Sequence, residues 1–158
     1  MKFLSITFFI APLLALCLPA NETPYGTAAK RQPAGVDFNK LIPEKLGTFT
    51  RISYKDPSPG LDGEAMYRSG NKEIFMLFSK ADTRKDLKET METILDEIKE
   101  NRTTEARSIE LKTDPAYIHF IGPRIAFFAW TRDLYCFSAD SKNGDKKGLE
   151  EFMKAFPY

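Results

Sequence analysis

The feature that most restricts the fold of this chain is an aromatic stretch at residues 116–139, AYIHFIGPRIAFFAWTRDLYCFSA. Gly122-Pro123 and Arg132-Asp133 are typical turn residues, and they divide the stretch into three apolar segments of strand length. Strands joined by such short turns pair antiparallel with their neighbours. We therefore expect a three-stranded meander whose aromatic side chains supply much of the core.

Segments before the meander also have the composition of strands. They are residues 48–54, 64–69, 74–80 and 107–112. Alternation in the first of them places Ile52 and Tyr54 on one face. Gly70-Asn71 tolerates the positive φ of a tight hairpin and joins the second segment to the third. The third is apolar on both faces, since Phe75 and Leu77 alternate with further apolar residues, which favours a central strand covered on each side.

Two segments have the apolar period of an amphipathic helix. The longer runs from Thr83 to Asn101, and Thr83 and Asp86 have the spacing of a capping box. The shorter follows the polar loop at residues 141–145 and ends at Pro157. The apolar stripes are Leu87, Met91, Ile94, Leu95 and Ile98 in the first helix, and Leu149, Phe152, Met153 and Phe156 in the second. Each stripe is suited to packing against a sheet.

The order of these elements is β-ββ-α-β-βββ-α. We therefore predict an α+β fold in which two amphipathic helices pack on a mostly antiparallel sheet of about seven strands. No internal repeat is visible, so residues 37–158 are expected to form a single domain.

Residues 1–20 predict export. Lys2 precedes a short apolar run, and Ala20 is followed by polar residues, which is the pattern of a signal peptide. No stop-transfer pattern follows, so no membrane span is expected after signal removal. Cleavage after Cys17 is an alternative to cleavage after Ala20, and lipid anchoring at Cys17 is disfavoured by the bulky Leu16 before it. The expected location is the periplasm or the outside of the cell.

Residues 21–36 combine Pro, Gly, Ala and Thr without periodicity, which predicts a flexible leader. Leu41-Ile42-Pro43 is expected to dock this leader onto the domain. Asn21 and Asn101 each begin an Asn-X-Thr sequon. Both are possible glycosylation sites only in a eukaryotic host.

Charge and residue content exclude several classes of function. The signal peptide holds one of the 23 basic residues and none of the 22 acidic ones, so the mature chain has equal numbers of each. Nucleic acids and anionic membranes favour a positive excess, and neither is an expected partner. Cys136 is the only mature thiol and His119 the only histidine, so no internal disulfide can form and no metal site is expected. No Gly-rich phosphate loop is present, and no cofactor is expected.

Cys136 and His119 are the one pair that could form an activated thiolate, with Asp133 or Asp140 as the acid. A small thiol-dependent hydrolase or redox protein is therefore an alternative function. A core role is the competing interpretation, because Cys136 lies between aromatic residues and a lone cysteine there behaves as a small apolar side chain. On this interpretation the chain has no catalytic residue.

The meander also offers a binding surface. Alternation places Phe128, Trp130 and Arg132 on one face and Phe127 on the other. If the helices cover only one face, aromatic rings beside a guanidinium are exposed on the other, which suits a ligand or a protein partner. The competing expectation is that both faces are covered. Phe128, Trp130 and Arg132 are the candidate binding residues.

Several phrases of the sequence resemble those of small exported α+β domains. They are residues 46–51 (LGTFTR), 65–70 (AMYRSG), 130–135 (WTRDLY) and 149–157 (LEEFMKAFP). The layout of residues 38–157 is similar to the PsbP-like architecture, in which helices sandwich an antiparallel sheet. The resemblance implies a non-catalytic accessory role at a membrane, and it carries over no catalytic or ligand-binding motif.

We therefore expect an exported, non-enzymatic binding or accessory protein. Its partner would be another envelope or extracellular protein, or a small apolar ligand. The alternatives are a thiol-dependent hydrolase or redox protein that uses Cys136 and His119, and a secreted inhibitor or immunity-type protein, which needs no internal active site.

Overall fold

The computed structural model describes residues 37–102, 108–113, 116–122 and 124–157. The predicted signal peptide and leader, with Cys17 and Asn21, lie outside these residues. Asn101 lies in the last turn of helix α2 (Arg84–Arg102), and the threonine of its sequon lies outside the described residues. None of the helices in the described ranges is long and apolar enough to cross a membrane.

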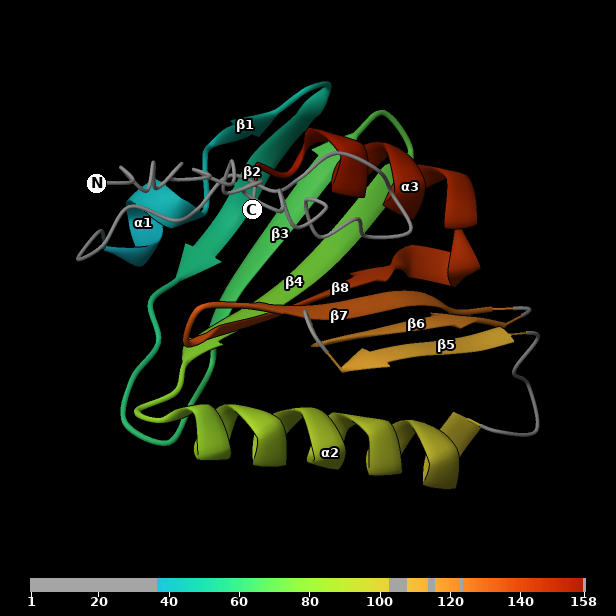
Figure 1. Cartoon of the computed structure of the whole chain (residues 1–158). Coiled ribbons are helices and arrows are strands. Elements are labelled where there is room, and N and C mark those ends of the chain that lie inside the picture. Colours follow the sequence, from blue (N-terminus) through green and yellow to red (C-terminus); the bar gives the residue numbers. More distant parts are fainter. Residues whose placement is uncertain (1–36, 103–107, 114–115, 123, 158) are drawn as a thin grey trace, which may run out of the picture.

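The described residues form one eight-stranded antiparallel sheet with the strand order β1-β2-β3-β4-β8-β7-β6-β5 (Figure 1). The strands are β1 (Lys45–Leu46), β2 (Phe49–Lys55), β3 (Gly63–Ser69), β4 (Lys72–Lys80), β5 (Ser108–Thr113), β6 (Ala116–Ile121), β7 (Ala126–Arg132) and β8 (Tyr135–Ser141). The helices are α1 (Phe38–Leu41), α2 (Arg84–Arg102) and α3 (Lys146–Ala155), and a short 3-10 turn, η2 (Lys142–Gly144), precedes α3. The predicted α+β class is confirmed.

The strands predicted from the sequence correspond to β2–β8, and β1 is an additional strand of 2 residues. The hairpin between β3 and β4 is confirmed, because Ser69 pairs with Lys72 across a turn in which Gly70 has a φ of +61°. β4 pairs with β8 in the middle of the sheet, so its predicted central position is confirmed.

The alternation predicted for β2 is wrong at Ile52. β2 pairs with β3 in one register as far as Arg51 and in a shifted register from Ser53 onward. Ile52 is therefore the extra residue of a β-bulge, and it is 45% exposed. Tyr54 lies on the other side and stacks on Phe78 with ring centroids 5.7 Å apart.

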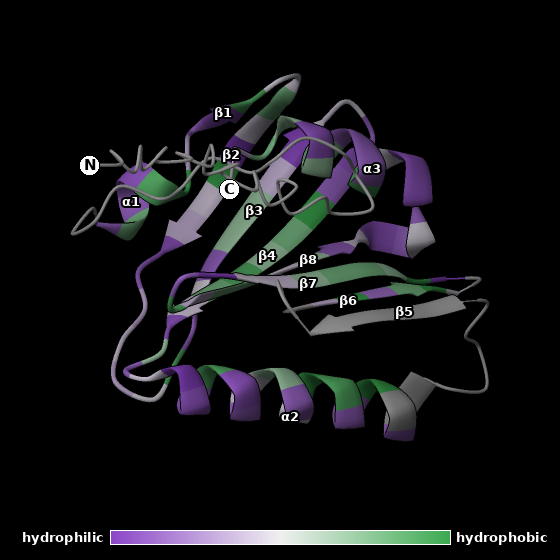
Figure 2. Cartoon of the chain, viewed as in Figure 1, coloured by the Kyte–Doolittle hydropathy of each residue, from purple (hydrophilic) through white to green (hydrophobic). Residues whose placement is uncertain are grey.

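The helices lie on opposite faces of the sheet (Figure 1). We call the side with Ile74 and Met76 of β4 the upper face and the side with Phe75 the lower face. α1 and α3 pack on the upper face, over the larger of two apolar cores. α2 packs on β6, β7 and β8 of the lower face, over the smaller core. In Figure 2 apolar and hydrophilic residues alternate along α2, as expected for a helix with one buried side.

Both long helices begin at capping residues. The Thr83 amide donates to the Asp86 carboxylate at 3.0 Å, and the Asp86 amide donates to the Thr83 hydroxyl at 3.2 Å, which confirms the capping box. Asp145 caps α3 by accepting from the Gly148 amide at 2.9 Å. The predicted stripes are confirmed, with Leu87, Met91, Ile98, Leu149, Phe152, Met153 and Phe156 buried and Ile94 and Leu95 partly buried.

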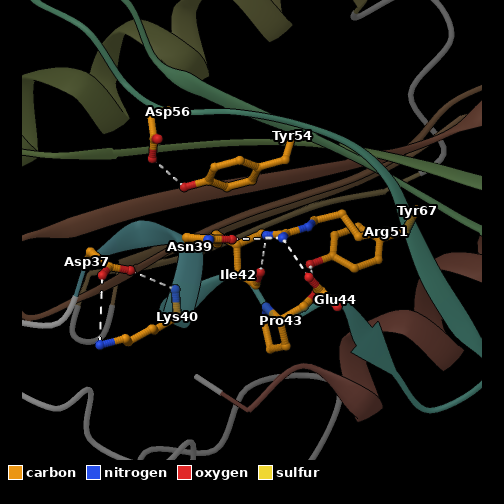
Figure 3. A network of polar contacts seen from close by, with 10 residues as sticks. All are labelled: Asp37, Asn39, Lys40, Ile42, Pro43, Glu44, Arg51, Tyr54, Asp56 and Tyr67. Carbon is orange, nitrogen blue, oxygen red and sulfur yellow. Dashed lines mark hydrogen bonds and ion pairs between the residues drawn. The ribbon is translucent and has the colours of Figure 1, made fainter.

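A polar network fastens the segment before β1 to the sheet (Figure 3). The Arg51 guanidinium donates to the Ile42 carbonyl at 2.5 Å and to the Asn39 side-chain oxygen at 2.8 Å. The Tyr67 hydroxyl donates to the Pro43 carbonyl at 2.7 Å, and burial raises the pKa of this hydroxyl, so it keeps its proton. These bonds satisfy backbone carbonyls at the edge of the upper core, which is a structural role.

Candidate functional site

Two of the three candidate binding residues on the meander, Phe128 and Trp130, lie in the upper core. Phe128 and Trp130 are 0% and 1% exposed. Trp130 stacks on Phe137 and meets Phe156 edge-on, both with ring centroids 5.3 Å apart. Arg132 at the end of β7 is half-buried, and burial lowers its pKa. The alternative of an open face is therefore wrong at Phe128 and Trp130, and the competing expectation of a covered face holds there, because α1 and α3 pack on this side of the sheet.

Cys136 and His119 lie on opposite faces of the sheet. His119 pairs with Phe128 in the β6–β7 ladder, and the two rings meet on the upper face with centroids 5.8 Å apart. Cys136 lies in the lower core, where its thiol is 3.8 Å from the sulfur of Met91 in α2. The sheet therefore separates the thiol from the imidazole, and the two cannot form the activated pair. In the described part of the chain no group of three or more His, Cys, Asp or Glu could hold a metal ion.

We expect the Cys136 thiol to react slowly with alkylating reagents in the folded protein. The side chain is buried, and burial raises its pKa to about 12, so almost no thiolate exists at neutral pH. Iodoacetamide labelling of a chain that lacks residues 1–20 can be followed by mass spectrometry, with and without denaturant. Equally fast labelling in both conditions would contradict a buried thiol.

The lower face of β4 is open at Phe75. This side chain is 39% exposed, whereas Ile74 and Met76 beside it on the upper face are 0% exposed. The prediction that β4 is covered on both faces is therefore wrong at this position. The physical reason is the width of a helix, because α2 packs on β6, β7 and β8 and does not extend across β4 and β3 as well.

Phe75 lies in a groove of about 360 Å³ on this open part of the lower face. β3 and β4 form one side of the groove, where Met66 is paired with Phe75. The loop between β6 and β7 and the turn η2 form the other side, where Ile125 adds apolar surface. A hollow of this size, lined by Met66, Phe75 and Ile125 together with polar and charged side chains, is within the range of sites that bind small molecules.

Charged side chains gather at one end of the groove. Glu73 is within 2.6 Å of the Lys142 ammonium and 2.7 Å of the Arg68 guanidinium. The hydrogen bond from Lys142 is the main cause that lowers the pKa of Glu73, and the hydrogen bond from Arg68 is the second. This carboxylate is therefore ionised. Asp140 of β8 pairs with Phe75, so its carboxylate lies beside that ring and not at this end. Arg124 is exposed and forms no ion pair with any residue that the structure describes.

A glycine contact holds the second side of the groove together. Gly144 ends η2 with a φ of +70°, and a Cβ atom at this position would lie 2.6 Å from backbone atoms of Arg124 and Ile125. Only glycine allows both this φ and this approach. The Gly122 amide also donates to the Ile125 carbonyl at 2.8 Å. The loop that carries Arg124 therefore packs backbone against backbone on the turn that carries Lys142.

Ser141 borders the groove, and its hydroxyl is buried without a hydrogen-bond partner among the described residues. Alternation along β8 places this side chain on the upper face with Phe137 and Ala139. The unpaired hydroxyl therefore destabilises the upper core, and we do not assign it to the groove.

The sequence pattern does not identify the groove residues as a group. Glu73 and Lys142 are 69 positions apart in the chain, and the pairing of β4 with β8 brings them together. One sequence signal for the groove was available. β4 has a second apolar face, with Phe75 and Leu77, and the sequence predicts only one long helix that could cover it.

The chain matches no family model, and comparison with curated proteins and with solved structures finds no similar protein. The resemblance to the PsbP-like architecture therefore remains a prediction. What the groove binds must be inferred from its own residues.

Proposed function

We propose that this chain is an exported, non-enzymatic protein that binds a small apolar ligand in the groove of the lower face. The observation that carries the proposal is Phe75, a large apolar side chain on a central strand that is 39% exposed in the groove. Exposure of such a side chain is unfavourable because apolar surface in contact with water costs free energy. A ligand in the groove would remove this surface from water.

The shape of the groove favours a small ligand over a protein partner. A stable protein interface buries about 800 Å² on each partner. Around the groove such an interface would extend over the charged pair Lys55 and Glu64, which lies on the same face of β2 and β3. Charged residues are depleted from the centres of protein interfaces. The apolar surface of Met66, Phe75 and Ile125 is instead concave and small.

Two further observations support the rest of the proposal. Export is supported by the signal-peptide pattern of residues 1–20. The absence of catalysis is supported by the position of Cys136, which is buried on the opposite face from His119.

The neutral fluorescent probe N-phenyl-1-naphthylamine tests the proposal. Its emission should rise on binding to the groove, because the probe leaves water for an apolar site. Phe75→Ser should weaken binding by about tenfold, since it removes the largest apolar side chain of the groove. A fluorescence titration of both proteins measures the two dissociation constants.

Leu61→Ser is the matched control. Leu61 is 60% exposed and does not line the groove, so its loss should leave probe binding unchanged. Circular dichroism should show that both variants remain folded, because both side chains are partly in water. The proposal fails if the wild-type protein does not bind the probe, or if both serine variants weaken binding equally.

A further inference from the structure

We propose that the ligand of the groove is an amphipathic anion, with its apolar part on Phe75 and its charged group held by Arg124. This inference rests on the proposed function and adds the chemical class of the ligand. It is carried by two observations, the arrangement of charged and apolar residues along the strands and an excess of positive charge at one end.

Polarity changes along the lower face in the direction of the strands. Arg68 pairs with Glu73 in the β3–β4 ladder, and the next pair on the same face is Met66 with Phe75. Consecutive pairs on one face are about 7 Å apart, because each residue of a strand advances by about 3.4 Å. On β8 this second row continues with Asp140, which pairs with Phe75. A ligand lying along the strands therefore meets a charged row at one end and, at the other, two apolar side chains with the Asp140 carboxylate beside them.

The charges at this end do not balance. Lys142 and Arg68 both contact the single carboxylate of Glu73, at 2.6 Å and 2.7 Å. Asp140 does not belong to this end, because it pairs with Phe75 in the β4–β8 ladder. Of the four charged side chains at this end, Lys142, Arg68 and Arg124 are cationic and Glu73 is anionic. The groove is therefore complementary to a ligand with a negative charge.

Arg124 is the group best placed to hold that charge. It lines the groove next to Ile125, has no ion-pair partner among the described residues, and can donate two parallel hydrogen bonds to a carboxylate, sulfonate or phosphate. The backbone contact of Gly144 fixes the loop that carries it. A site fixed in this way loses little conformational freedom when the ligand binds.

Two probes with one aromatic skeleton test the inference. N-phenyl-1-naphthylamine is neutral, and 8-anilinonaphthalene-1-sulfonate differs from it by a single sulfonate. Arg124→Gln should weaken binding of the sulfonate probe by about fivefold, the size of an exposed ion pair, and change binding of the neutral probe by less than about twofold. Added salt should weaken the binding of the sulfonate probe only, because ions screen exposed charges.

Arg84→Gln is the control for removal of a positive charge. Arg84 is exposed at the start of α2, and this helix begins beside the β7–β8 turn, where the Ala81 amide donates to the Leu134 carbonyl. The groove lies at the other end of β8, so this variant should bind both probes as the wild-type protein does.

The outcomes separate this inference from the proposed function. Two results would contradict an anionic ligand and leave the proposed apolar groove unchanged. In one, the neutral probe binds through Phe75 but the sulfonate probe does not bind. In the other, Arg124→Gln weakens the binding of both probes equally. If Arg84→Gln weakens the sulfonate probe as much as Arg124→Gln does, Arg124 is not its binding group. If neither probe binds the wild-type protein, the proposed function fails as well.

Discussion

Trp130→Ala is expected to destabilise the domain by about 3–5 kcal/mol, the usual cost of removing a fully buried aromatic side chain. Trp130 is 1% exposed and packs against Phe128, Phe137 and Phe156, with ring centroids 5.3 to 5.4 Å apart. These rings belong to β7, β8 and the end of α3, so the indole joins the sheet to the helix. Alanine would leave a cavity between rigid elements that cannot close around it.

Urea unfolding followed by circular dichroism measures this effect. Fluorescence is unsuitable because Trp130 is the only tryptophan of the chain. The midpoint should fall while the slope of the free energy of unfolding against urea stays the same. Phe75→Ala is the control, and it should cost much less because Phe75 is 39% exposed. A Trp130→Ala protein with wild-type stability would contradict the burial and restore the meander as a candidate surface.

The elements could be predicted from the sequence where one period runs through a whole segment. In α2 every predicted stripe residue from Leu87 to Ile98 faces the sheet, and Thr83 and Asp86 form the predicted cap. In the β3–β4 hairpin Gly70 supplies the φ that the turn requires. In these cases neighbours in the sequence are neighbours in space, so local rules are sufficient.

Local rules fail where one residue breaks the period. The alternation of β2 places Ile52 with Tyr54, but the bulge at Ile52 shifts the register and turns it away from the core. Nothing in the composition of the strand marks a bulge, because the bulge is a property of the pairing with β3.

The sequence could not show which face is covered, because that depends on where each helix lies. A helix with its side chains is about 10–12 Å wide and strands lie about 4.8 Å apart, so one helix covers only about two or three strands. α3 lies over Trp130 on the upper face, and α2 lies away from Phe75 on the lower face. The candidate site therefore lies on β4 and not on the meander. The same two-residue alternation does separate Cys136 from His119, but only once the strands are placed in register.

Gly63→Ala is the second large effect, with an expected cost of about 1–3 kcal/mol from overpacking. Gly63 lies directly opposite Phe78 in the β3–β4 ladder, and a Cβ atom there would lie closer than 3.0 Å to three atoms of the Phe78 ring. The ring cannot move aside, because Phe38 and Tyr54 pack against it with centroids 5.2 and 5.7 Å away. The cost is therefore steric and belongs to one pair of residues.

A double-mutant cycle with Phe78→Leu isolates that pair. Leucine is smaller than phenylalanine, so Gly63→Ala should cost at least about 1 kcal/mol less in the Phe78→Leu background, as measured by urea unfolding. Gly60→Ala is the control, since Gly60 has a φ of +75° and open space around it. Its cost comes from the backbone and should be the same in both backgrounds.

The cycle also tests the geometry of the groove without any ligand. The register that sets Gly63 against Phe78 is the one that sets Met66 against Phe75 and Arg68 against Glu73. A slip of one residue would turn Phe75 into the upper core and Phe78 toward water, since side chains alternate between the faces. Additive costs for Gly63→Ala and Phe78→Leu would therefore remove the structural basis of the groove. A coupled cycle would place Phe75 on the lower face, away from Phe78, whatever the two probes report.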